Sequence, residues 1–492
     1  MSDATAHTGS YQGRRVTVMG LGSFGGGVAA ARFLAARGAE VTITDLKQEA
    51  DLTPSLQTLD DVKIRAFYLG GHPDAAFADC ELLVVNPAVK PGAPPIPRCQ
   101  AAGAMITTEI ELFLRHCHGQ IVAITGSNGK STTAALVHHL LRTNSALNGR
   151  TVVLGGNIGT SLLPVVDQLT DDDLIVLELS SFQLERLREA APRPAVAVIT
   201  GFSANHLDWH GDLTSYQAAK QVILNSQRRD DVAVLPDEWL VNQSLPAAGP
   251  GPSGCGPSGS AVEPTWRVRG KCLRFGCHDS GDDGVFADDG QLILRDRGRE
   301  DAIRFQQPPQ LPGEHNARNI AAATCAAWQM GADPTEFPDS LRSFQPLPHR
   351  LQCVAAGKGL SFWNDSLATT PESAIAALHT FRQPVVIMAG GSDKGSDLIS
   401  FADAICQHSV GAVLMGDTAD VLETLIRQNS GFRHLSLLVA RDFHQAFTQA
   451  VALTPQAGIV LLSPGCASYD WFRDYRDRGE QFTKLALDWI KS

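Results

Sequence analysis

One glycine-rich segment ends in a lysine and two hydroxyl residues, a set that could bind nucleotide phosphates and a metal ion. It directly follows an apolar run over residues 120–125 and comprises Gly126, Ser127, Asn128, Gly129, Lys130, Ser131 and Thr132. Glycines let backbone N–H groups point at phosphate oxygens, lysine neutralises phosphate charge, and a hydroxyl can bind Mg²⁺. Ile124 stands where a strict P-loop has its first glycine. The pattern therefore predicts a variant nucleotide-binding loop; a simple turn is the alternative.

A single acidic residue interrupts the apolar run over residues 174–179. This residue is Glu178, and the run around it is typical of a buried parallel strand. An ionised carboxylate is costly there unless a cation lies beside it. We therefore expect Glu178 to meet a metal ion near the nucleotide loop, and a salt bridge to an arginine is the alternative.

Two further groups could contribute to the same chemistry. His206, Asp208 and His210 follow a predicted strand over 195–200 and could supply metal ligands, although ordinary hydrogen bonding is the alternative. Lys220 borders the apolar face of a predicted helix over 214–226. If the Lys220 side chain extends to solvent, it is an ordinary surface lysine. If it is buried, its pKa falls and its neutral amine becomes reactive.

Near the N-terminus, three glycines follow the predicted strand 15–19 in the pattern Gly20-x-Gly22-x-x-Gly25, and Asp45 ends the next strand. This pattern fits NAD, and equally any diphosphate held at a helix N-terminus. A tight turn without a ligand is the alternative reading.

Three polar clusters in the last third of the chain each follow a predicted strand. They cover residues 364–366, 390–394 and 463–470. Ligands of open α/β sheets bind beyond the carboxyl ends of the strands, so these clusters predict a substrate-binding edge. Ordinary loop polarity is the alternative.

The elements that must position these residues alternate between strands and helices along the whole chain. This alternation predicts an α/β fold with parallel, doubly wound sheets. We expect three domains: a Rossmann-like domain over 1–118, a P-loop-type ATP-binding domain over 119–346, and a Rossmann-like domain over 347–492. Residues 249–260 are Gly, Pro or Ser at all positions but one, which predicts a flexible insertion at about 245–264 of the central domain.

Length and composition narrow the class of protein. The chain has 492 residues, 43% of them hydrophobic, and a net charge of −11. This balance argues against a nucleic-acid coat or a polybasic membrane-binding protein. The ten cysteines form no CxxC pair, no apolar run reaches membrane-spanning length, and the N-terminal residues lack a signal core. We therefore expect a cytoplasmic protein with reduced thiols and no membrane insertion.

Taken in order, these motifs resemble those of the Mur ligase family over nearly the whole chain. Besides the glycine-rich loop they are GGNIG (155–159), LELSSFQLE (177–185), NHLDWH (205–210), YQAAK (216–220), GEHNARN (313–319), LPHR (347–350), NDSLATTPES (364–373), GGSDKG (390–395) and SPGCASYDWF (463–472). The segments SSFQLE and CASxDxF favour the glutamate-adding type. The DNPR-type signature of the diaminopimelate- or lysine-adding enzymes is absent from the sequence.

The resemblance implies an ATP-dependent, amide-forming ligase. Such an enzyme adds D-glutamate to UDP-N-acetylmuramoyl-L-alanine through an acyl phosphate, in peptidoglycan precursor synthesis. ATP is its co-substrate, two Mg²⁺ ions are its cofactors, and a monomer without nucleic acid is expected. Residue types alone do not fix the enantiomer, because the same donors can hold D- or L-glutamate.

The resemblance also implies roles for individual residues. The UDP-substrate would be held by Gly20, Leu21, Gly22, Ser23, Asp45, Lys47, Asn157, Ser180 and Gln183. Residues 126–132 would bind ATP together with Asn316, Asn319, Arg350 and Asp365. The catalytic residues would be Lys130, Glu178, His206 and Lys220, and the metal ligands Ser131, Thr132, Glu178, His206 and Lys220, the last as the family's carbamylated lysine. Glutamate would be held by Thr369, Lys394, Ser468 and Tyr475.

Three features depart from the family's well-known enterobacterial pattern. Leu367 replaces the lysine of NDSKAT, Tyr475 stands where phenylalanine is common, and the Gly/Pro/Ser insertion lengthens the central domain. Other function classes are also open at this point. They are another ligase of the superfamily, such as a folylpolyglutamate synthase-like or L-glutamate-adding enzyme, an NAD-dependent oxidoreductase, and a non-catalytic nucleotide-binding regulator.

Overall fold

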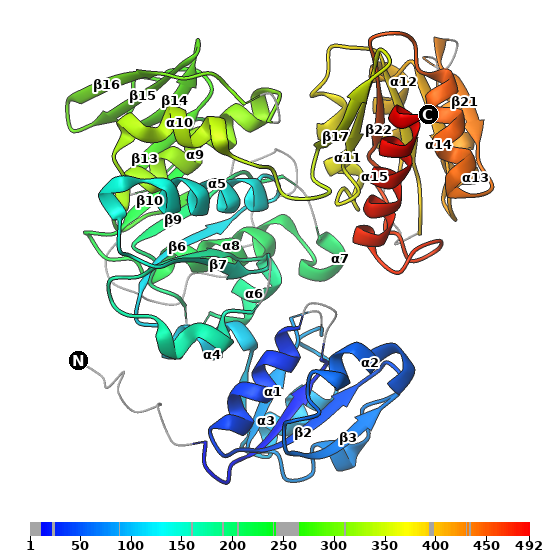
Figure 1. Cartoon of the computed structure of the whole chain (residues 1–492). Helices are drawn as coiled ribbons and strands as arrows, with labels where there is room; N and C mark the ends of the chain where they lie inside the picture. The colour runs from blue at the N-terminus through cyan, green and yellow to red at the C-terminus, as the bar shows by residue number, and fades with distance from the viewer. Residues whose placement is uncertain are drawn as a thin grey trace, which may run out of the picture. The chain divides into compact units, whose positions relative to one another are not determined.

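The computed structural model describes residues 11–21, 25–87, 89–158, 161–188, 191–203, 206–239, 241–242, 265–308, 311–392, 398–429, 431 and 434–492 (Figure 1). Gly22, Ser23, Lys394 and the predicted insertion at 245–264 lie outside these residues. The chain divides into two compact units: Met1–Asp288, Leu292–Ile303 and Ala321–Phe337 form the first, and Asp289–Gln291, Arg304–Ile320 and Pro338–Ser492 form the second. The boundaries near residues 118 and 346 stay predictions.

The first unit begins with a five-stranded parallel sheet of order β3-β2-β1-β4-β5. Its strands are β1 (Arg15–Met19), β2 (Glu40–Asp45), β3 (Ile64–Leu69), β4 (Leu82–Val85) and β5 (Met105–Thr107). Its helices are α1 (Gly26–Ala36), α2 (Glu49–Gln57), α3 (Pro95–Ala101) and α4 (Glu109–His116). The strand order reverses between β1 and β4, and ligands of such sheets bind at this point. The predicted Rossmann-like fold is confirmed here.

The same unit contains most of a nine-stranded sheet of order β16-β15-β14-β13-β10-β9-β6-β8-β7. Its strands are β6 (Gln120–Thr125), β7 (Val152–Gly156), β8 (Leu174–Glu178), β9 (Val196–Ile199), β10 (Val232–Pro236), β13 (Lys271–Gly276), β14 (Gly284–Asp288), β15 (Gln291–Asp296) and β16 (Arg299–Arg304). The helices of this unit are α5 (Lys130–Thr143), α6 (Ser181–Arg186), α7 (Leu207–His210) and α8 (Leu213–Asn225), and β11 (Val241–Asn242) pairs separately with β12 (Trp266–Arg267). Helix α9 (Glu314–Gln329) belongs to the first unit from Ala321 onward, and α10 (Phe337–Ser343) belongs to the second unit from Pro338 onward. Strands β7, β8, β6, β9 and β10 run parallel, as the sequence predicted.

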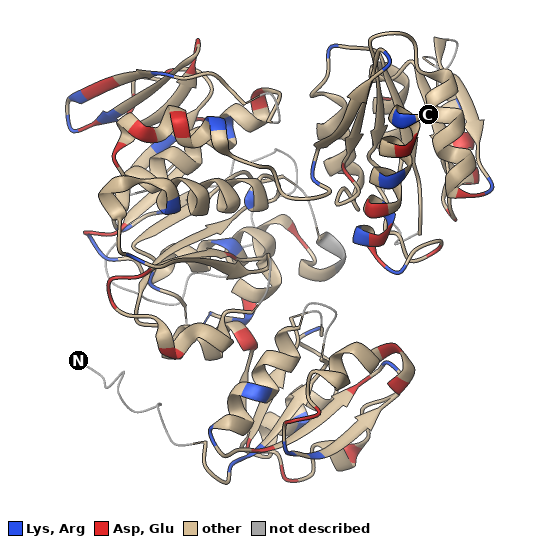
Figure 2. Cartoon of the chain, viewed as in Figure 1, with Lys and Arg blue, Asp and Glu red and all other residues tan. Residues whose placement is uncertain are grey.

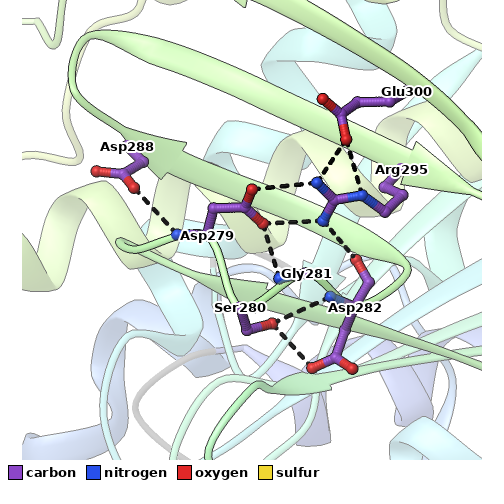
Figure 3. Close-up of polar contacts among 7 residues, drawn as sticks. All are labelled: Asp279, Ser280, Gly281, Asp282, Asp288, Arg295 and Glu300. Atoms are coloured by element: carbon purple, nitrogen blue, oxygen red, sulfur yellow. Dashed lines mark hydrogen bonds and ion pairs between the residues drawn. The ribbon is translucent and has the colours of Figure 1, made fainter.

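One arginine holds together the strands at the far edge of this sheet (Figure 3). Both Nη atoms of Arg295 donate to the carboxylate of Asp279, at 2.8 and 3.1 Å, and Nε donates to Glu300 at 2.9 Å. These ion pairs lower the pKa of the Asp279 carboxyl and raise the pKa of the arginine. The guanidinium thus joins the carboxylates of Asp279 and Glu300 in one ion-pair network.

The second unit is built on a six-stranded sheet of order β17-β18-β22-β19-β20-β21. The strands are β17 (Gln352–Gly357), β18 (Leu360–Asn364), β19 (Val385–Ala389), β20 (Gly411–Leu414), β21 (Ser436–Val439) and β22 (Gly458–Leu462). The helices are α11 (Pro371–Leu378), α12 (Ile399–His408), α13 (Ala419–Gln428), α14 (Phe443–Leu453) and α15 (Tyr475–Lys491). Neighbouring strands of this sheet run parallel except β17 and β18, an antiparallel edge that the strand pattern did not reveal.

Alternate side chains of β19 show that this sheet is covered on both faces. Val385 and Ile387 pack into one core cluster with residues of α11, α12 and α13. Val386 and Met388 pack into a second cluster with residues of α14 and α15. Successive side chains of a strand point to opposite faces, so the two clusters lie on opposite sides of the sheet. The predicted doubly wound α/β fold is confirmed.

Within the part of the chain that the structure describes, no helix combines the length and apolar character needed to cross a membrane. Acidic and basic residues are interspersed along α15 and over strands β14 to β16 (Figure 2).

Candidate active site

The glycine-rich loop joins β6 to α5 and requires glycine at its first position. Gly126 has φ 153°, and a Cβ atom there would lie 2.1 Å from Thr200 Oγ1. Ser127 N donates to Gly201 O at 2.8 Å, so the segment after β9 lies directly against the loop. Gly129, at φ 81°, forms the N-cap of α5. The structure thus confirms the strand, loop and helix arrangement that a phosphate-binding motif needs.

Ile124 departs from the strict P-loop pattern because it belongs to the strand. Its side chain is fully buried, and it pairs with Glu178 on β8 and with Val198 on β9. The turn therefore begins two residues later, at Gly126.

Gly126→Ala should destabilise the protein by on the order of 1–3 kcal/mol, because the methyl group meets Thr200 and the backbone angle is strained. Gly149→Ala is the matched control, since Gly149 also has positive φ, 90°, but a Cβ atom added there would have no other atom within 4 Å. Chemical denaturation of both variants measures the effect. Equal losses of stability would show that the contact with Thr200 is unimportant.

Two lysines converge on one carbonyl of the loop. Lys130 Nζ donates to Gly126 O and to Ser127 O, both at 3.0 Å, and Lys220 Nζ donates to Gly126 O at 2.8 Å. Lys220 is only 1% exposed. Burial lowers its pKa well below the usual value; the charge of Lys130 lowers it further, and Glu178 opposes the change. The solvent-exposed alternative for Lys220 is therefore wrong, whereas its carbamylation stays a prediction.

Glu178 ends β8 beside this loop and is 1% exposed. Asn157 Nδ2 donates to its Oε1 at 2.9 Å, whereas its buried Oε2 has no hydrogen-bond partner among the described residues. The alternative of an arginine salt bridge is likewise not seen in the described part of the chain. A buried carboxylate oxygen without a donor suits a divalent cation, so the residues present fit the predicted Mg²⁺.

His206, just before α7, and His210, at its end, have different surroundings. The ring of His206 lies 4.8 Å from that of Phe182, and its backbone has φ 55°. His210 is buried, with Nε2 3.0 Å from Ser181 Oγ and Nδ1 3.8 Å from Glu185 Oε2. For His210 the hydrogen-bonding alternative is confirmed. Metal binding by His206 stays a prediction.

Tyr216 also belongs to this site, although its residue type alone did not point to it. Its hydroxyl lies 3.1 Å from Ser127 Oγ, and the Nζ atom of Lys220 lies 4.4 Å from the centre of its ring. The sequence indicated only that Tyr216 and Lys220, four residues apart on one helix, share a helix face.

In the first sheet, Asp45 shapes the turn after β1. Its Oδ2 accepts a hydrogen bond from Leu21 N at 2.8 Å, and its Oδ1 accepts one from Lys47 N at 2.9 Å. Gly20 has φ 88°. Gly27 lies outside the predicted glycine pattern, but a Cβ atom there would lie 2.5 Å from Gly20 O, so this position also requires glycine. Both carboxylate oxygens are engaged by the backbone, which is a different role from the ribose contact of an NAD site.

The three residues predicted for the muramoyl-alanine side lie after β7 and β8. Asn157 bonds to Glu178. Ser180 and Gln183 form a capping box at the start of α6, in which Ser180 N donates to Gln183 Oε1 at 2.9 Å and Gln183 N donates to Ser180 Oγ at 3.3 Å. Their contact with a substrate stays a prediction.

In the second unit, Asp365 is buried after β18. Its Oδ1 accepts from Leu351 N at 3.0 Å, and its Oδ2 accepts from Ser463 Oγ at 2.7 Å. Burial raises the pKa of Asp365 to about 6, although Ser463 and the charge of Arg350 act in the opposite direction.

The other predicted residues of this unit also lie on loops or helix starts. Asn319 Nδ2 donates to Asn316 Oδ1 at 3.2 Å on α9, and Thr369 N donates to Leu367 O at 2.8 Å. Ser468 is buried after β22, and the backbone carbonyl of Tyr475 accepts a hydrogen bond from Ser366 Oγ at 2.7 Å. The clusters after β19 and β22 do meet, since Ser392 N donates to Ala467 O at 2.9 Å.

Asp365→Asn should remove a pH dependence of stability. Because the folded pKa is raised, Asp365 favours the folded state at low pH, and this contribution is lost as the pH rises from about 4 to about 6. Relative to the variant, the wild type should lose on the order of 2–3 kcal/mol across that interval. Denaturation at several pH values measures this, with exposed Asp488→Asn as the control. Parallel curves for wild type and Asp365→Asn would contradict the expectation.

Comparisons with known proteins agree with this geometry. Three family models match the chain: "Mur ligase MurD-like, N-terminal domain" over residues 14–108, "Mur ligase middle domain" over 124–249, and "Mur ligase, glutamate ligase domain" over 349–466. The UDP-N-acetylmuramoylalanine–D-glutamate ligase of Roseiflexus sp. (strain RS-1) is 38% identical over 478 residues, which cover 96% of this chain and 98% of that protein. The chain belongs to the Mur ligase family.

Other comparisons extend over most of this Mur ligase as well. The enzyme of the same name from Pelotomaculum thermopropionicum is 33% identical over 474 residues, covering 96% of this chain and 97% of that one. Among solved structures, MurF from Acinetobacter baumannii aligns with a TM-score of 0.54 and 16% identity, over 93% of this chain and 92% of that one. MurF from Thermotoga maritima in complex with ADP aligns with a TM-score of 0.51 and 15% identity, over 92% of this chain and 95% of that one. The structural matches support the shared fold, and the family assignment rules against the NAD-dependent oxidoreductase.

Proposed function

We propose that this Mur ligase adds D-glutamate to UDP-N-acetylmuramoyl-L-alanine with hydrolysis of ATP, in cytoplasmic peptidoglycan precursor synthesis. The relatives that match nearly the whole chain carry the name of this activity. The observation that carries the chemistry is the buried cluster after β6 and β8. There, Lys130 and Lys220 converge on Gly126 O, and Glu178 presents a carboxylate oxygen without a donor.

The five-, nine- and six-stranded sheets support different binding roles for three domains, 1–118, 119–346 and 347–492. The turn after β1, with Gly20, Leu21 and the Asp45–Lys47 segment, would hold the UDP end of the acceptor. Residues 126–132 would hold the ATP phosphates, with Asn316, Asn319, Arg350 and Asp365 contributing to nucleotide binding. The loops after β18, β19 and β22, with Thr369, Lys394, Ser468 and Tyr475, would receive glutamate. We propose that the enzyme acts as a monomer without nucleic acid.

A carboxylate must be activated before an amine can attack it, because hydroxide is a poor leaving group. Transfer of the γ-phosphoryl group of ATP to the alanyl carboxylate gives an acyl phosphate. The glutamate amine then attacks the acyl carbon, and phosphate leaves from the tetrahedral intermediate. Exclusion of water protects the acyl phosphate from hydrolysis.

Residues of the central site can assist phosphoryl transfer directly. Lys130, which bonds loop carbonyls in the structure, can move its ammonium to the phosphate oxygens. Two Mg²⁺ ions, bound by Glu178, His206, the hydroxyls of Ser131 and Thr132, and carbamylated Lys220, would neutralise charge on the transferred group. His206 would either orient a metal or accept a proton from the amine.

Release of ADP by the purified protein tests this function. ADP should form only when UDP-N-acetylmuramoyl-L-alanine, glutamate, ATP and Mg²⁺ are all present, and D-glutamate should be the enantiomer used. Turnover with L-glutamate alone would support the L-glutamate-adding alternative. ATP binding without ADP release in the complete mixture would contradict the proposal and favour a nucleotide-binding regulator.

A further inference from the structure

Arg478 lies at the centre of the loops that surround the predicted glutamate site. It belongs to the second turn of α15 and has no exposed surface. A fully buried arginine is uncommon in proteins unless its charge and its donors are satisfied.

Every donor of this guanidinium has an acceptor within the protein. Nε donates to Ser366 Oγ at 2.9 Å, and Nη2 donates to Ser366 O at 2.8 Å and to Cys466 O at 3.2 Å. Nη1 donates to Cys466 O and to Ala467 O, both at 3.2 Å. A guanidinium has five N–H donors, and all are used. Arg478 therefore has no donor left for direct contact with a substrate in this arrangement.

These acceptors connect separate loops at the carboxyl edge of the sheet. Ser366 follows β18, and Cys466 and Ala467 follow β22. Ala467 O also accepts from Ser392 N after β19, at 2.9 Å. A Cβ atom at Gly391 would lie 2.1 Å from Ala467 O and 3.3 Å from Arg478 Nη1, so the loop after β19 packs against the same group. Loss of the guanidinium would loosen all three loops.

The acceptors are neutral oxygens, and within the described ranges no carboxylate forms an ion pair with Arg478. Asp470 and Asp365 act on it only at longer range. Burial lowers the pKa of Arg478 to about 10, so the side chain stays charged at neutral pH. Its positive charge is held by backbone carbonyls of the loops where an amino acid with two carboxylates is expected.

We propose that Arg478 is a positioning residue for the incoming amino acid. It fixes the loops after β18, β19 and β22 in the conformation that receives glutamate, and its charge favours a dicarboxylate in their vicinity. This inference rests on the proposed ligase function.

The test compares Arg478→Met and Arg478→Lys with the wild type, each with KM measured for glutamate, ATP and the UDP-linked acceptor. Arg478→Met should raise the KM for glutamate by about tenfold or more, since several charge-assisted hydrogen bonds are lost. The KM for the acceptor should change by less than about twofold, and the KM for ATP should rise by a smaller factor than that for glutamate, because Asp365, proposed to bind the nucleotide, is next to Ser366. Arg478→Lys keeps the charge but lacks the planar fork, so its glutamate KM should rise by a smaller factor.

Ile426→Ala is the control for a loss of stability alone. Ile426 is buried on α13 in the same unit, within the core cluster of the face covered by α11 to α13. It should lower the melting temperature without changing the glutamate KM selectively. A wild-type glutamate KM in soluble Arg478→Lys or Arg478→Met, or an equal rise of all three KM values, would overturn the inference. If the wild type releases no ADP, the ligase function itself fails, which is a distinct outcome.

Discussion

Lys220→Ala should lower the rate of ligation on the order of 10³-fold, the largest effect expected from any single substitution in this protein. Lys220 is buried, contacts Gly126 O at 2.8 Å, and lies within electrostatic range of Glu178 and Lys130. Its depressed pKa makes a neutral amine available, and a neutral amine is the form that reacts with CO₂ to give a carbamate. The carbamate would convert a cation into a carboxylate ligand for Mg²⁺. Steady-state ADP release measures the loss.

Short carboxylates added to Lys220→Ala should restore part of the activity, because they can take the place of the carbamate. Asn225→Ala is the control on the same helix, since Asn225 is exposed and its side chain accepts a hydrogen bond from Gln221, away from the loop. Full activity of Lys220→Ala would remove the carbamate hypothesis. Loss without rescue by any carboxylate would assign Lys220 a role as a cation near the loop.

Glu178→Gln should separate activity from stability. The rate should fall on the order of 10²–10³-fold, because a ligand of Mg²⁺ is lost. Without Mg²⁺, the variant should be at least as stable as the wild type, because Oε2 is buried without a donor and the charge is costly there. Added Mg²⁺ should raise the melting temperature of the wild type and not that of the variant.

Asp173→Asn is a matched control just before the same strand. Asp173 is also buried, but its carboxylate accepts from Thr151 N at 2.9 Å and from Thr170 N at 2.7 Å, and these bonds lower its pKa. Its replacement should cost stability and leave the turnover rate nearly unchanged. If Glu178→Gln destabilises the protein as Asp173→Asn does and keeps its rate, then Glu178 has a purely structural role.

Much of the fold could be read from the sequence, because buried parallel strands are short apolar runs. The predicted strands at 15–19, 82–85, 105–107 and 120–125 coincide with β1, β4, β5 and β6. The edge strand β17 was not predicted. In its last four residues, VAAG over 354–357, only Val354 is strongly hydrophobic, so the sequence there lacks the apolar run of a buried strand. The prediction of helix 214–226 differs from α8 by one residue at each end.

The site could be predicted where a residue type contradicts its surroundings. Glu178 in an apolar strand and Lys220 on an apolar helix face were found for that reason, and both are buried beside the loop. Thr200 and Arg478 gave no such signal. Thr200 matters because it follows β9 and would be met by a Cβ atom at Gly126, which follows β6. Arg478 lies in a charged helix segment of a kind that is typical of solvent exposure. Its partner Ser366 is 112 residues away, and only the folded chain brings them together.

The most direct test of the central claim, amide formation through an acyl phosphate, is the fate of oxygen in the acceptor carboxylate. UDP-N-acetylmuramoyl-L-alanine with both alanyl carboxylate oxygens labelled with ¹⁸O is incubated with D-glutamate, ATP and Mg²⁺, and the phosphate and peptide products are analysed by mass spectrometry. Activation by phosphoryl transfer predicts that each phosphate released carries one ¹⁸O atom and that the new amide keeps the other. Unlabelled phosphate in a reaction that still forms the amide would contradict the account.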